Sequence, residues 1–233
     1  MNIKKDIHNV IRKREAWSLI FSLPNTIWFN LRYLSFSQAI KLPIWVHYSC
    51  RYKAYRGGIV LSDKINTAMI RYGFSVDYAK NYNDNTYFYI RKGAVCKFEG
   101  NAHIGRGSKI IVQKNAVLEI GDDFSISASS TIKCYKHIVI GKGVLFAWDC
   151  LLMDSDGHQI YGIDNKLINH DKEIAIGNNV WLGCGVTILK GVTIPNDCVV
   201  GAKTTITRGT FESNTIIVGN PPKSKKDIKN WVI

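Results

Sequence analysis

The chain has 233 residues, of which 46% are hydrophobic and 21% charged, a composition typical of a soluble globular protein with a substantial core. Its formal net charge of +13 is less usual. Residues 1–90 hold 13 Lys and Arg against 5 Asp and Glu, so 13 − 5 = +8 of this excess lies there. The asymmetry favours a polyanionic partner, such as an anionic membrane, a nucleic acid or a phosphorylated ligand, although a charge excess also serves solubility.

Residues 1–41 form a basic, aromatic extension that we expect to be helical. Its most apolar part, residues 16–34, contains Pro24, Asn30 and Arg32, whereas a membrane span needs about 20 mostly apolar residues. No transmembrane helix is therefore expected. Two interpretations stay open: the segment lies in a membrane interface, or it packs on the main domain. Because no secretory signal precedes it, we expect a cytoplasmic protein, with peripheral contact at the inner face of the plasma membrane as an option.

The six cysteines form no CxxC pair and no zinc-like spacing. They are Cys50, Cys96, Cys134, Cys150, Cys184 and Cys198. Reduced thiols fit a cytosolic protein best, and most of them should act as small core hydrophobes.

A six-residue repeat dominates the rest of the chain. From Ile176, apolar residues return at every sixth position to Ile206; Glu212 breaks the series and Val218 resumes it. Shorter runs keep the same step across 98–116, 120–132 and 140–152. A period of six fits neither an α-helix nor a plain alternating strand. It predicts short strands joined by tight turns that wind into a parallel β-helix with three faces.

The repeat also divides the chain. We expect irregular first coils over 42–97, regular coils over 98–223 with an excursion loop at 153–173, and a short tail at 224–233. The fold class is mainly β, with a partly helical N-terminal extension.

The stretch "IAIGNNVWLGCGVTILKGVTIPNDCVVGAKTTITRG" and the later "VGNPPK" resemble the hexapeptide-repeat acyltransferases, in particular sugar and polysaccharide O-acetyltransferases. This resemblance implies left-handed winding, acetyl-CoA as donor, a sugar acceptor and a homotrimer whose clefts lie between neighbouring prisms. The segment 23–46 is also similar, more loosely, to the lead-in of enzymes that acetylate cell-surface polysaccharides. The implied acceptor is a surface glycan or its lipid-linked precursor.

The repeat stops between Leu152 and Ile176, and the sequence "DSDGHQI" there carries His158. Long loops on rigid scaffolds are often functional, although a loop histidine can also be merely solvent-exposed. Acetyl transfer to a hydroxyl needs a base near neutral pKa, which suits histidine. The resemblance assigns this role to His158, with direct transfer and no acyl-enzyme. Asp154, Asp156 and Asp149 are candidates to orient its ring, or they cap their own turns.

Two further residues are expected to meet the acceptor. Asp149 falls where several relatives carry Asn at the coil edge. Trp181 belongs to the family motif "VWLG", and because Leu182 holds the inward position, alternation turns Trp181 outward rather than into the core. An exposed indole offers a flat surface for a sugar or for the pantetheine arm.

The resemblance places coenzyme A along the C-terminal coils. The pantetheine would approach the backbone at small residues, and the nucleotide phosphates would meet cations. The residues concerned are Gly183, Cys184, Ala202, Lys203, Thr207, Arg208 and Lys223. Two departures from the family pattern are Lys203 in place of a usual Gly, and "NPPK" in place of "NPAK". Lys203 either adds a phosphate contact or narrows the channel; Arg208 and Lys223 could also be solvated turn charges.

Other functions remain as alternatives. A zinc enzyme of the γ-carbonic anhydrase type needs convergent histidines, yet His103, His137, His158 and His170 show no HxxxxH spacing, and no metal is expected. A non-catalytic scaffold is less favoured because the loop histidine and Trp181 are both present. No nucleic-acid motif accompanies the basic residues. N-acetylation of an amino sugar and acetylation of serine stay open within the acetyltransferases.

Overall fold

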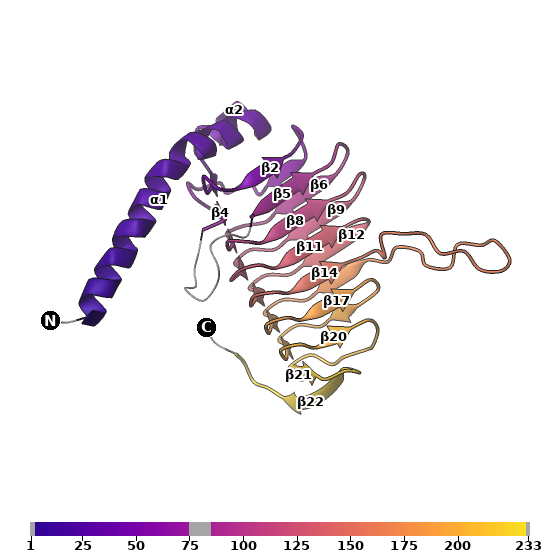
Figure 1. Cartoon of the computed structure of the whole chain (residues 1–233). Coiled ribbons are helices and arrows are strands. Elements are labelled where there is room, and N and C mark those ends of the chain that lie inside the picture. The colour runs from indigo at the N-terminus through magenta and orange to yellow at the C-terminus, as the bar shows by residue number, and fades with distance from the viewer. Residues whose placement is uncertain (1–2, 75–84, 232–233) are drawn as a thin grey trace.

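The protein is a parallel β-helix with a long helix at its N-terminal end, as the computed structural model shows (Figure 1). The structure describes residues 3–74 and 85–231, with the side chains of residues 3–16 and 226 left aside. The strands form three sheets, here called A, B and C, with nine, seven and six strands. The predicted fold class, a left-handed parallel β-helix with a helical N-terminal extension, is confirmed.

Successive strands pass from sheet A to B to C, so each coil contributes one strand to each face. Sheet A holds β1 Ile44–Val46, β4 Ile70–Tyr72, β7 Ala102–Ile104, β10 Phe124–Ile126, β13 Leu145–Phe146, β16 Trp181–Leu182, β19 Val199–Val200, β21 Thr215–Val218 and β22 Lys223–Asp227. Sheet B holds β2 Arg51–Lys53, β5 Tyr87–Ile90, β8 Lys109–Val112, β11 Thr131–Cys134, β14 Leu151–Met153, β17 Thr187–Leu189 and β20 Thr205–Ile206. Sheet C holds β3 Ile59–Leu61, β6 Val95–Phe98, β9 Val117–Ile120, β12 His137–Ile140, β15 Ile174–Ile176 and β18 Thr193–Ile194.

The sixth-position residues form the core, as the repeat predicts. Parallel register stacks Ile140 on Ile176 and Ile176 on Ile194, and all three are buried. The residue two positions earlier, such as Ile174, is buried as well. Each coil therefore lays its apolar side chains on those of the coil before. Full burial of one such side chain stabilises the fold by roughly 1.5–3 kcal/mol relative to exposure.

Tight turns at the prism edges need glycine where backbones nearly touch. A Cβ on Gly141 would lie 2.6 Å from the carbonyl carbon of Gly177, on the next coil. A side chain there would push two coils apart, so the glycine after the anchor keeps the stacking distance.

The phase of the last coil differs from the prediction. Ile217 is fully buried while Val218 is half-buried, so the inward residue precedes the expected one. After β20 the chain returns directly to sheet A at β21 without adding a strand to sheet C. The missing strand removes the constraint that kept the six-residue step, which explains both the break at Glu212 and the shift.

The N-terminal extension forms α1 (Ile3–Tyr33), with Pro24 inside it, and the short α2 (Phe36–Ala39). Within the described residues, no helix is long and apolar enough to cross a bilayer. Of the cysteines, all but the half-buried Cys184 are buried, and none forms a disulfide, in line with the prediction.

Candidate functional site

The excursion loop leaves the prism where sheet B gives way to sheet C, here called edge BC. It connects the end of β14 at Met153 to the start of β15 at Ile174 and projects far from the coils (Figure 1). An antiparallel bridge between Tyr161 and Leu167 holds its distal part as a narrow hairpin. The loop is therefore an arm that extends beyond its own prism.

His158 lies near the base of this loop. It is exposed and lines an open depression of about 580 Å³, together with Tyr135 and Lys136 of the preceding coil and His170 of the returning strand. Its backbone carbonyl accepts a hydrogen bond of 2.7 Å from Asn169 Nδ2. Among the described residues the imidazole itself has no hydrogen-bond partner. The ring is thus accessible to a substrate, and its backbone is held.

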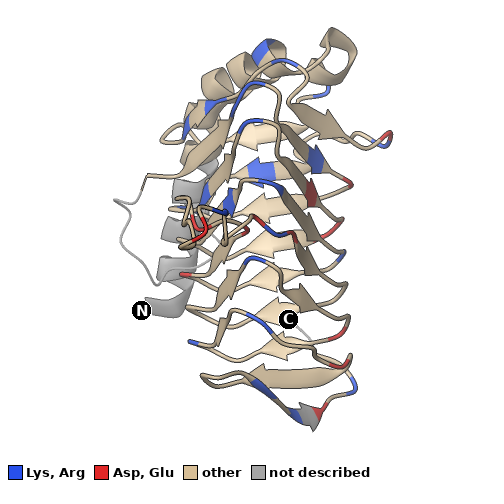
Figure 2. Cartoon of the chain, turned by 90° about the vertical axis from the view of Figure 1, so that its right-hand side faces the viewer, with Lys and Arg blue, Asp and Glu red and all other residues tan. Residues whose placement is uncertain are grey.

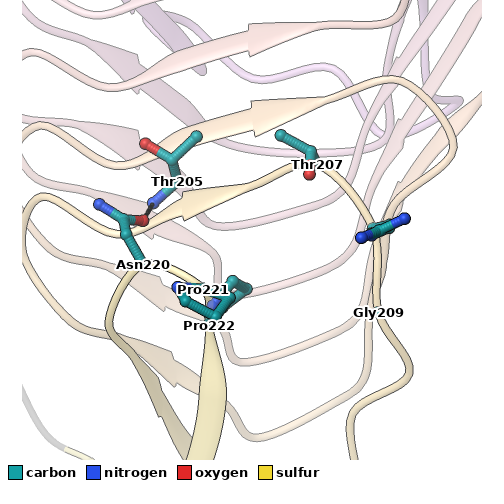
Figure 3. Close-up of a pocket in the computed structure, with 7 residues that line it drawn as sticks. Thr205, Thr207, Gly209, Asn220, Pro221 and Pro222 are labelled. Atoms are coloured by element: carbon teal, nitrogen blue, oxygen red, sulfur yellow. Dashed lines mark hydrogen bonds between the residues drawn. The ribbon is translucent and has the colours of Figure 1, made fainter.

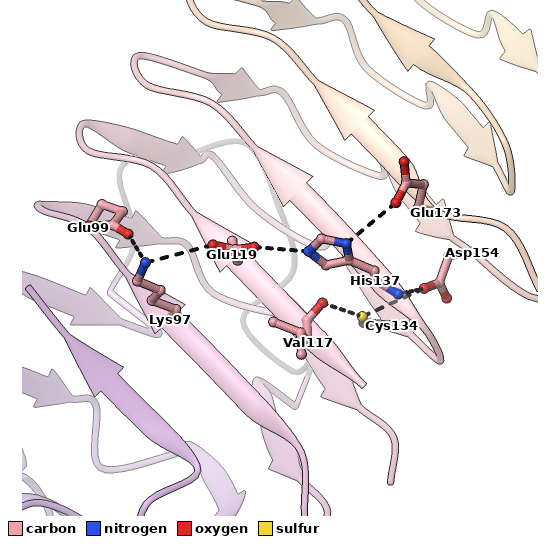
Figure 4. A network of polar contacts seen from close by, with 8 residues as sticks. All are labelled: Lys97, Glu99, Val117, Glu119, Cys134, His137, Asp154 and Glu173. Atoms are coloured by element: carbon pink, nitrogen blue, oxygen red, sulfur yellow. Dashed lines mark hydrogen bonds and ion pairs between the residues drawn. The ribbon is translucent and has the colours of Figure 1, made fainter. Parts of the chain in front are cut away.

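Asp154 is fully buried, and its carboxylate is directed at the backbone of the preceding coil. Its two oxygens accept hydrogen bonds from the N–H groups of Tyr135, Lys136 and His137 at 2.6 to 2.8 Å. Figure 4 shows this carboxylate beside Cys134 at the end of β11. Asp154 therefore fixes the turn that forms one wall of the His158 depression. Its predicted role in orienting the imidazole stays a prediction without a supporting contact.

Asp156 closes the base of the loop. Its Oδ2 accepts hydrogen bonds from Lys190 Nζ at 2.5 Å and from Asn169 Nδ2 at 2.9 Å. The same ammonium donates to the Asn169 carbonyl at 2.9 Å, so Lys190 ties the outgoing and returning strands together. Hydrogen bonding to Lys190, and then to Asn169, lowers the pKa of this exposed carboxyl below its usual value. Asp156 is placed to position the loop that carries His158.

The predicted pantetheine residues Gly183, Cys184, Ala202 and Lys203 lie together where sheet A gives way to sheet B, here called edge AB. Asp149 lies one coil earlier on the same edge, exposed and with a positive φ of 62°. A Cβ on Gly183 would come within 2.7 Å of the backbone nitrogen of Ala202, so only glycine allows this approach. Gly183 itself is buried, and the backbones of two successive coils are in close contact here, with Ala202 exposed.

Lys203, Cys150 and Cys184 also lie on edge AB. The aliphatic stem and ammonium of Lys203 cover Gly185, where an added Cβ would lie 2.8 Å from Cδ and 2.9 Å from Nζ. Cys150 is buried, and burial raises the pKa of its thiol to about 11, which leaves little thiolate at neutral pH. That thiol is a poor nucleophile.

Trp181 points outward from sheet A, as alternation predicts, and is 38% exposed. Trp231, close to the C-terminus, stacks against it with ring centroids 6.0 Å apart. The Trp231 indole N–H donates a 2.8 Å hydrogen bond to the carbonyl of Asn179, which anchors the tail across the prism. The two indoles form one aromatic surface that the sequence analysis did not anticipate.

A second open depression, of about 560 Å³, lies at the C-terminal end of sheet B (Figure 3). Thr207 and Arg208 line it, with Thr205 and the Asn220–Pro222 turn; Asn220 Oδ1 accepts a 2.8 Å hydrogen bond from the Thr205 backbone N–H. Lys203 and Lys223 are both exposed and are close in sequence to residues of this depression, but they do not line it. Of the four predicted phosphate contacts, the structure brings together Thr207 and Arg208.

These groups do not converge within one chain. His158 lies at edge BC, whereas Trp181 is on sheet A, and in a triangular prism the edge between two faces is opposite the third. His137 faces Glu119 and Glu173 on sheet C, at 2.9 and 3.5 Å (Figure 4). Within the described residues no three metal-binding side chains are close enough to hold an ion.

Comparison with known proteins gives the fold its context. The family model of the bacterial transferase hexapeptide (six repeats) matches residues 174–208. The match covers the regular coils from β15 to β20. The predicted resemblance to the hexapeptide-repeat acyltransferases is confirmed.

Several named proteins are similar to part of this chain. A polysialic acid O-acetyltransferase of Escherichia coli O1:K1 / APEC is 36% identical over 144 residues, which are 61% of this chain and 44% of that protein. A galactoside O-acetyltransferase of Lactococcus lactis is 28% identical over 131 residues, 56% of this chain and 55% of that one. The chain thus spans about half the length of these relatives. The polysialic acid O-acetyltransferase OatWY has the same fold, with 24% identity, a TM-score of 0.50 and coverage of 82% and 90%.

Sequence reasoning missed several residues around the site. Lys136 and Tyr135 flank His158 only because one coil brings residues about 22 positions apart into contact. Trp231 gave no signal, since it stands in a short tail outside the repeat. Lys190 could have been found, because it occupies a coil edge after β17, where the loop must return.

Proposed function

We propose that the protein is an acetyl-CoA-dependent O-acetyltransferase that acetylates a hydroxyl of a sugar in a bacterial surface polysaccharide or its lipid-linked precursor. The observation that carries this proposal is an exposed histidine on a loop base, beside a hexapeptide-repeat module that is shared with named sugar O-acetyltransferases. Two open depressions and a glycine-lined edge offer room for an acceptor and a donor.

The chemistry follows from the placement of His158. A sugar hydroxyl is a weak nucleophile until its proton is removed, and an imidazole with no competing hydrogen bond can take that proton. The hydroxyl oxygen then attacks the thioester carbonyl directly, and a backbone N–H at edge AB stabilises the negative charge that develops on the carbonyl oxygen. The tetrahedral intermediate collapses with cleavage of the C–S bond, and coenzyme A leaves as a thiol after taking the proton that His158 holds. The raised pKa of its thiol argues against Cys150 as a nucleophile that would carry the acetyl group.

The donor would lie along edge AB. Ala202 is small and exposed, so a thin pantetheine chain would reach the backbone there, with the half-buried Cys184 next to Gly183 on the coil before. Arg208 and Thr207 would receive the phosphates in the depression at the end of sheet B, and Lys203 or Lys223 could add a cation from its rim. On the acceptor side, Trp181 and Asp149 would contact the sugar.

We further propose that the working form is a homotrimer. Edges AB and BC both flank sheet B, so three prisms with sheet B turned toward a common axis bring edge AB of one chain to edge BC of the next. Sheet B carries several outward apolar side chains that are half-buried, interspersed with Lys, Arg and Thr. They include Tyr87, Tyr89, Ile111, Leu151, Met153 and Leu189. Sheet C instead carries the charged ladder of Figure 4.

Transfer from acetyl-CoA to glycans tests the proposal. Purified protein should move one acetyl group to a polysaccharide or lipid-linked oligosaccharide, as read by mass spectrometry, and mild alkali should remove it because esters are labile. An alkali-stable product would instead indicate an amide, and with it the alternative of amino-sugar N-acetylation. Surface glycan that keeps the same acetylation in a strain lacking the protein would contradict the proposed role.

A further inference from the structure

Helix α1 turns its polar face toward the β-helix, which is the reverse of an ordinary surface helix. Ser22, Thr26 and Asn30 follow each other at four-residue intervals and are all fully buried. A helix that packed on an apolar core would place aliphatic residues at these positions. The polar residues therefore serve another purpose.

They pair with the backbone of β1. Asn30 Nδ2 donates to the Ile44 carbonyl at 2.7 Å, and its Oδ1 accepts from the Ile44 N–H at 3.2 Å. The Thr26 hydroxyl accepts from the Val46 N–H at 3.0 Å and donates to the Val46 carbonyl at 3.3 Å. Each of the two side chains therefore pairs with both the N–H and the carbonyl of one strand residue.

Ser22 continues the ladder, with its Oγ accepting from the Tyr48 N–H at 3.0 Å. The distance along α1 between successive polar residues matches the distance along the strand between their partners, because four helix residues rise about 6 Å and two strand residues about 6.6 Å. Strand β1 is the first in sheet A, so its outer edge would otherwise expose unpaired backbone groups. The helix closes this edge with polar side chains, Phe29 packs beside them on Tyr52 and Phe88, and most of the other apolar residues of α1 are left on the opposite side.

The outward face of α1 is apolar over its described length. Trp17 is 59% exposed, and Phe21 and Trp28 are each 62% exposed. Further exposed members at helical spacing are Ile20, Ile27 and Leu31, with Phe36 and Ile40 continuing beyond the helix. Among the described residues, the ring of Phe21 meets that of Tyr48 with centroids 6.4 Å apart, and more than half of the Trp17, Phe21 and Trp28 side chains stays exposed. An exposed apolar stripe of this extent is typical of an interaction surface.

Positive charge accompanies this face. Described residues 41–74 contain six cations and a single acid, 6 − 1 = +5; the cations are Lys41, Arg51, Lys53, Arg56, Lys64 and Arg71, and the acid is Asp63. Figure 2 shows Lys and Arg on the coils at this end of the prism. Tyr52 packs on Phe29 of α1, so Arg51 and Lys53 lie beside the helix. The partner must match both an apolar and a cationic surface.

We propose that the outward face of α1 docks on an anionic lipid bilayer, lying in the interface rather than crossing it. Trp and Phe prefer the interfacial region, and nearby Lys and Arg are attracted to anionic headgroups. The helix ties the N-terminal end of the prism to the membrane, while the coils that carry His158 extend away from it (Figure 1). This inference is independent of the acetyl-transfer chemistry.

Vesicle binding by the full chain tests this proposal. The probe is extruded vesicles of 30% phosphatidylglycerol in phosphatidylcholine, compared with phosphatidylcholine alone. The triple variant Trp17→Gln, Phe21→Gln, Trp28→Gln should lose partitioning to the anionic vesicles on the order of a hundredfold, because three half-exposed aromatic side chains no longer enter the interface. The ladder of Ser22, Thr26 and Asn30 is untouched, so circular dichroism and melting should stay as in the parent.

The matched control removes three exposed apolar side chains from the excursion loop, as Ile160→Gln, Ile163→Gln, Ile168→Gln, and should bind vesicles like the parent. Parent binding should weaken at high salt and be small on neutral vesicles. Brominated lipid should quench tryptophan fluorescence of the parent and not of the α1 variant. Equal vesicle binding by all three proteins would overturn the proposal. So would a parent that ignores vesicles while the α1 variant alone changes its mass in light scattering, since that face would then join two copies.

Discussion

The two edges that flank sheet B are built from the same repeat but serve different purposes. Edge AB is a column of tight turns, where Gly183 lets one coil come within contact distance of Ala202 on the next. Edge BC is interrupted by an excursion of twenty residues, 154–173, that exposes His158. One edge offers close approach to the backbone, and the other offers a titratable side chain on an arm.

This difference teaches that a repetitive scaffold gains a site by breaking its period on only one edge. A regular edge cannot surround a substrate, and an arm without a backbone surface cannot hold a donor. The two edges lie at opposite margins of sheet B, and in the proposed trimer a second copy of the chain brings them together. Experiments that damage one edge at a time show whether both contribute to one reaction.

The largest effect is expected from edge BC. His158→Ala removes the proposed base, so kcat should fall by about 10²–10⁴-fold, the usual range for general-base catalysis. Acetyl-CoA affinity, measured by calorimetry, should stay near that of the parent because the donor lies on the other edge.

His170→Ala is the matched control, since this exposed histidine lines the same depression. It should keep most of the activity. If the His158→Ala variant has the same kcat as the His170→Ala variant, His158 is not the general base.

A second experiment asks whether the two edges act between chains. Ala202→Trp fills edge AB at an exposed position, and His158→Ala disables edge BC, so each variant alone should be nearly inactive. In randomly mixed trimers about a quarter of the sites should combine two intact edges from neighbouring chains, and activity should return accordingly.

Mixing that restores nothing, although native mass spectrometry shows mixed trimers, would place both edges of each site in one chain. A monomer that is fully active alone would contradict the trimer as well.

The sequence predicted the regular part of the fold well. The apolar residue at each sixth position, such as Ile188 or Ile194, is itself the buried one, so the period can be recognised without knowing its neighbours in space. It failed where the repeat ends: Ile217 replaces Val218 because β20 is followed by a strand of sheet A rather than C. It also located the loop and His158, since a broken period is visible in one dimension.

Contacts across coils were beyond that reasoning. The partners of Asp154 are backbone groups of residues 135–137, a full coil earlier, and no local pattern shows them. The pairing of Trp181 with Trp231 joins the repeat to a tail that has no period at all. Similarly, Pro24 and Asn30 were expected only to interrupt an apolar helix, whereas Asn30 forms hydrogen bonds with the outer edge of β1 at Ile44.

An intermediate effect is expected from the donor end of sheet B. Arg208→Ala should raise the acetyl-CoA KM about ten- to a hundredfold, since a charge-assisted contact contributes roughly 1.5–3 kcal/mol. The acceptor KM should hardly change, and the penalty should shrink with acetyl-pantetheine, which has no nucleotide. Lys223→Ala should matter less, because Lys223 does not line the depression.

Lys114→Ala removes an exposed cation from a distant turn and serves as control for net charge. If Arg208→Ala loses equal activity with both donors, the phosphates are bound elsewhere.

The smallest effect separates two roles for Asp156, direct orientation of the imidazole and positioning of the loop through Lys190. The structure favours the second, because the carboxylate meets Lys190 Nζ and Asn169 Nδ2, and Asn169 holds the His158 carbonyl. Asp156→Asn and Lys190→Met should each lower kcat about three- to tenfold, and the double variant should be little worse than either, as expected for coupled neighbours. If Asp156 only positions the loop, breaking the exposed Asp156–Lys190 pair from either side should move the midpoint of the kcat/KM pH profile by similar small amounts in opposite directions, downward for Asp156→Asn and upward for Lys190→Met, and the double variant should return it to the parent value. If Asp156 instead contacts the ring during the reaction, Asp156→Asn alone will shift that midpoint, and Lys190→Met will not.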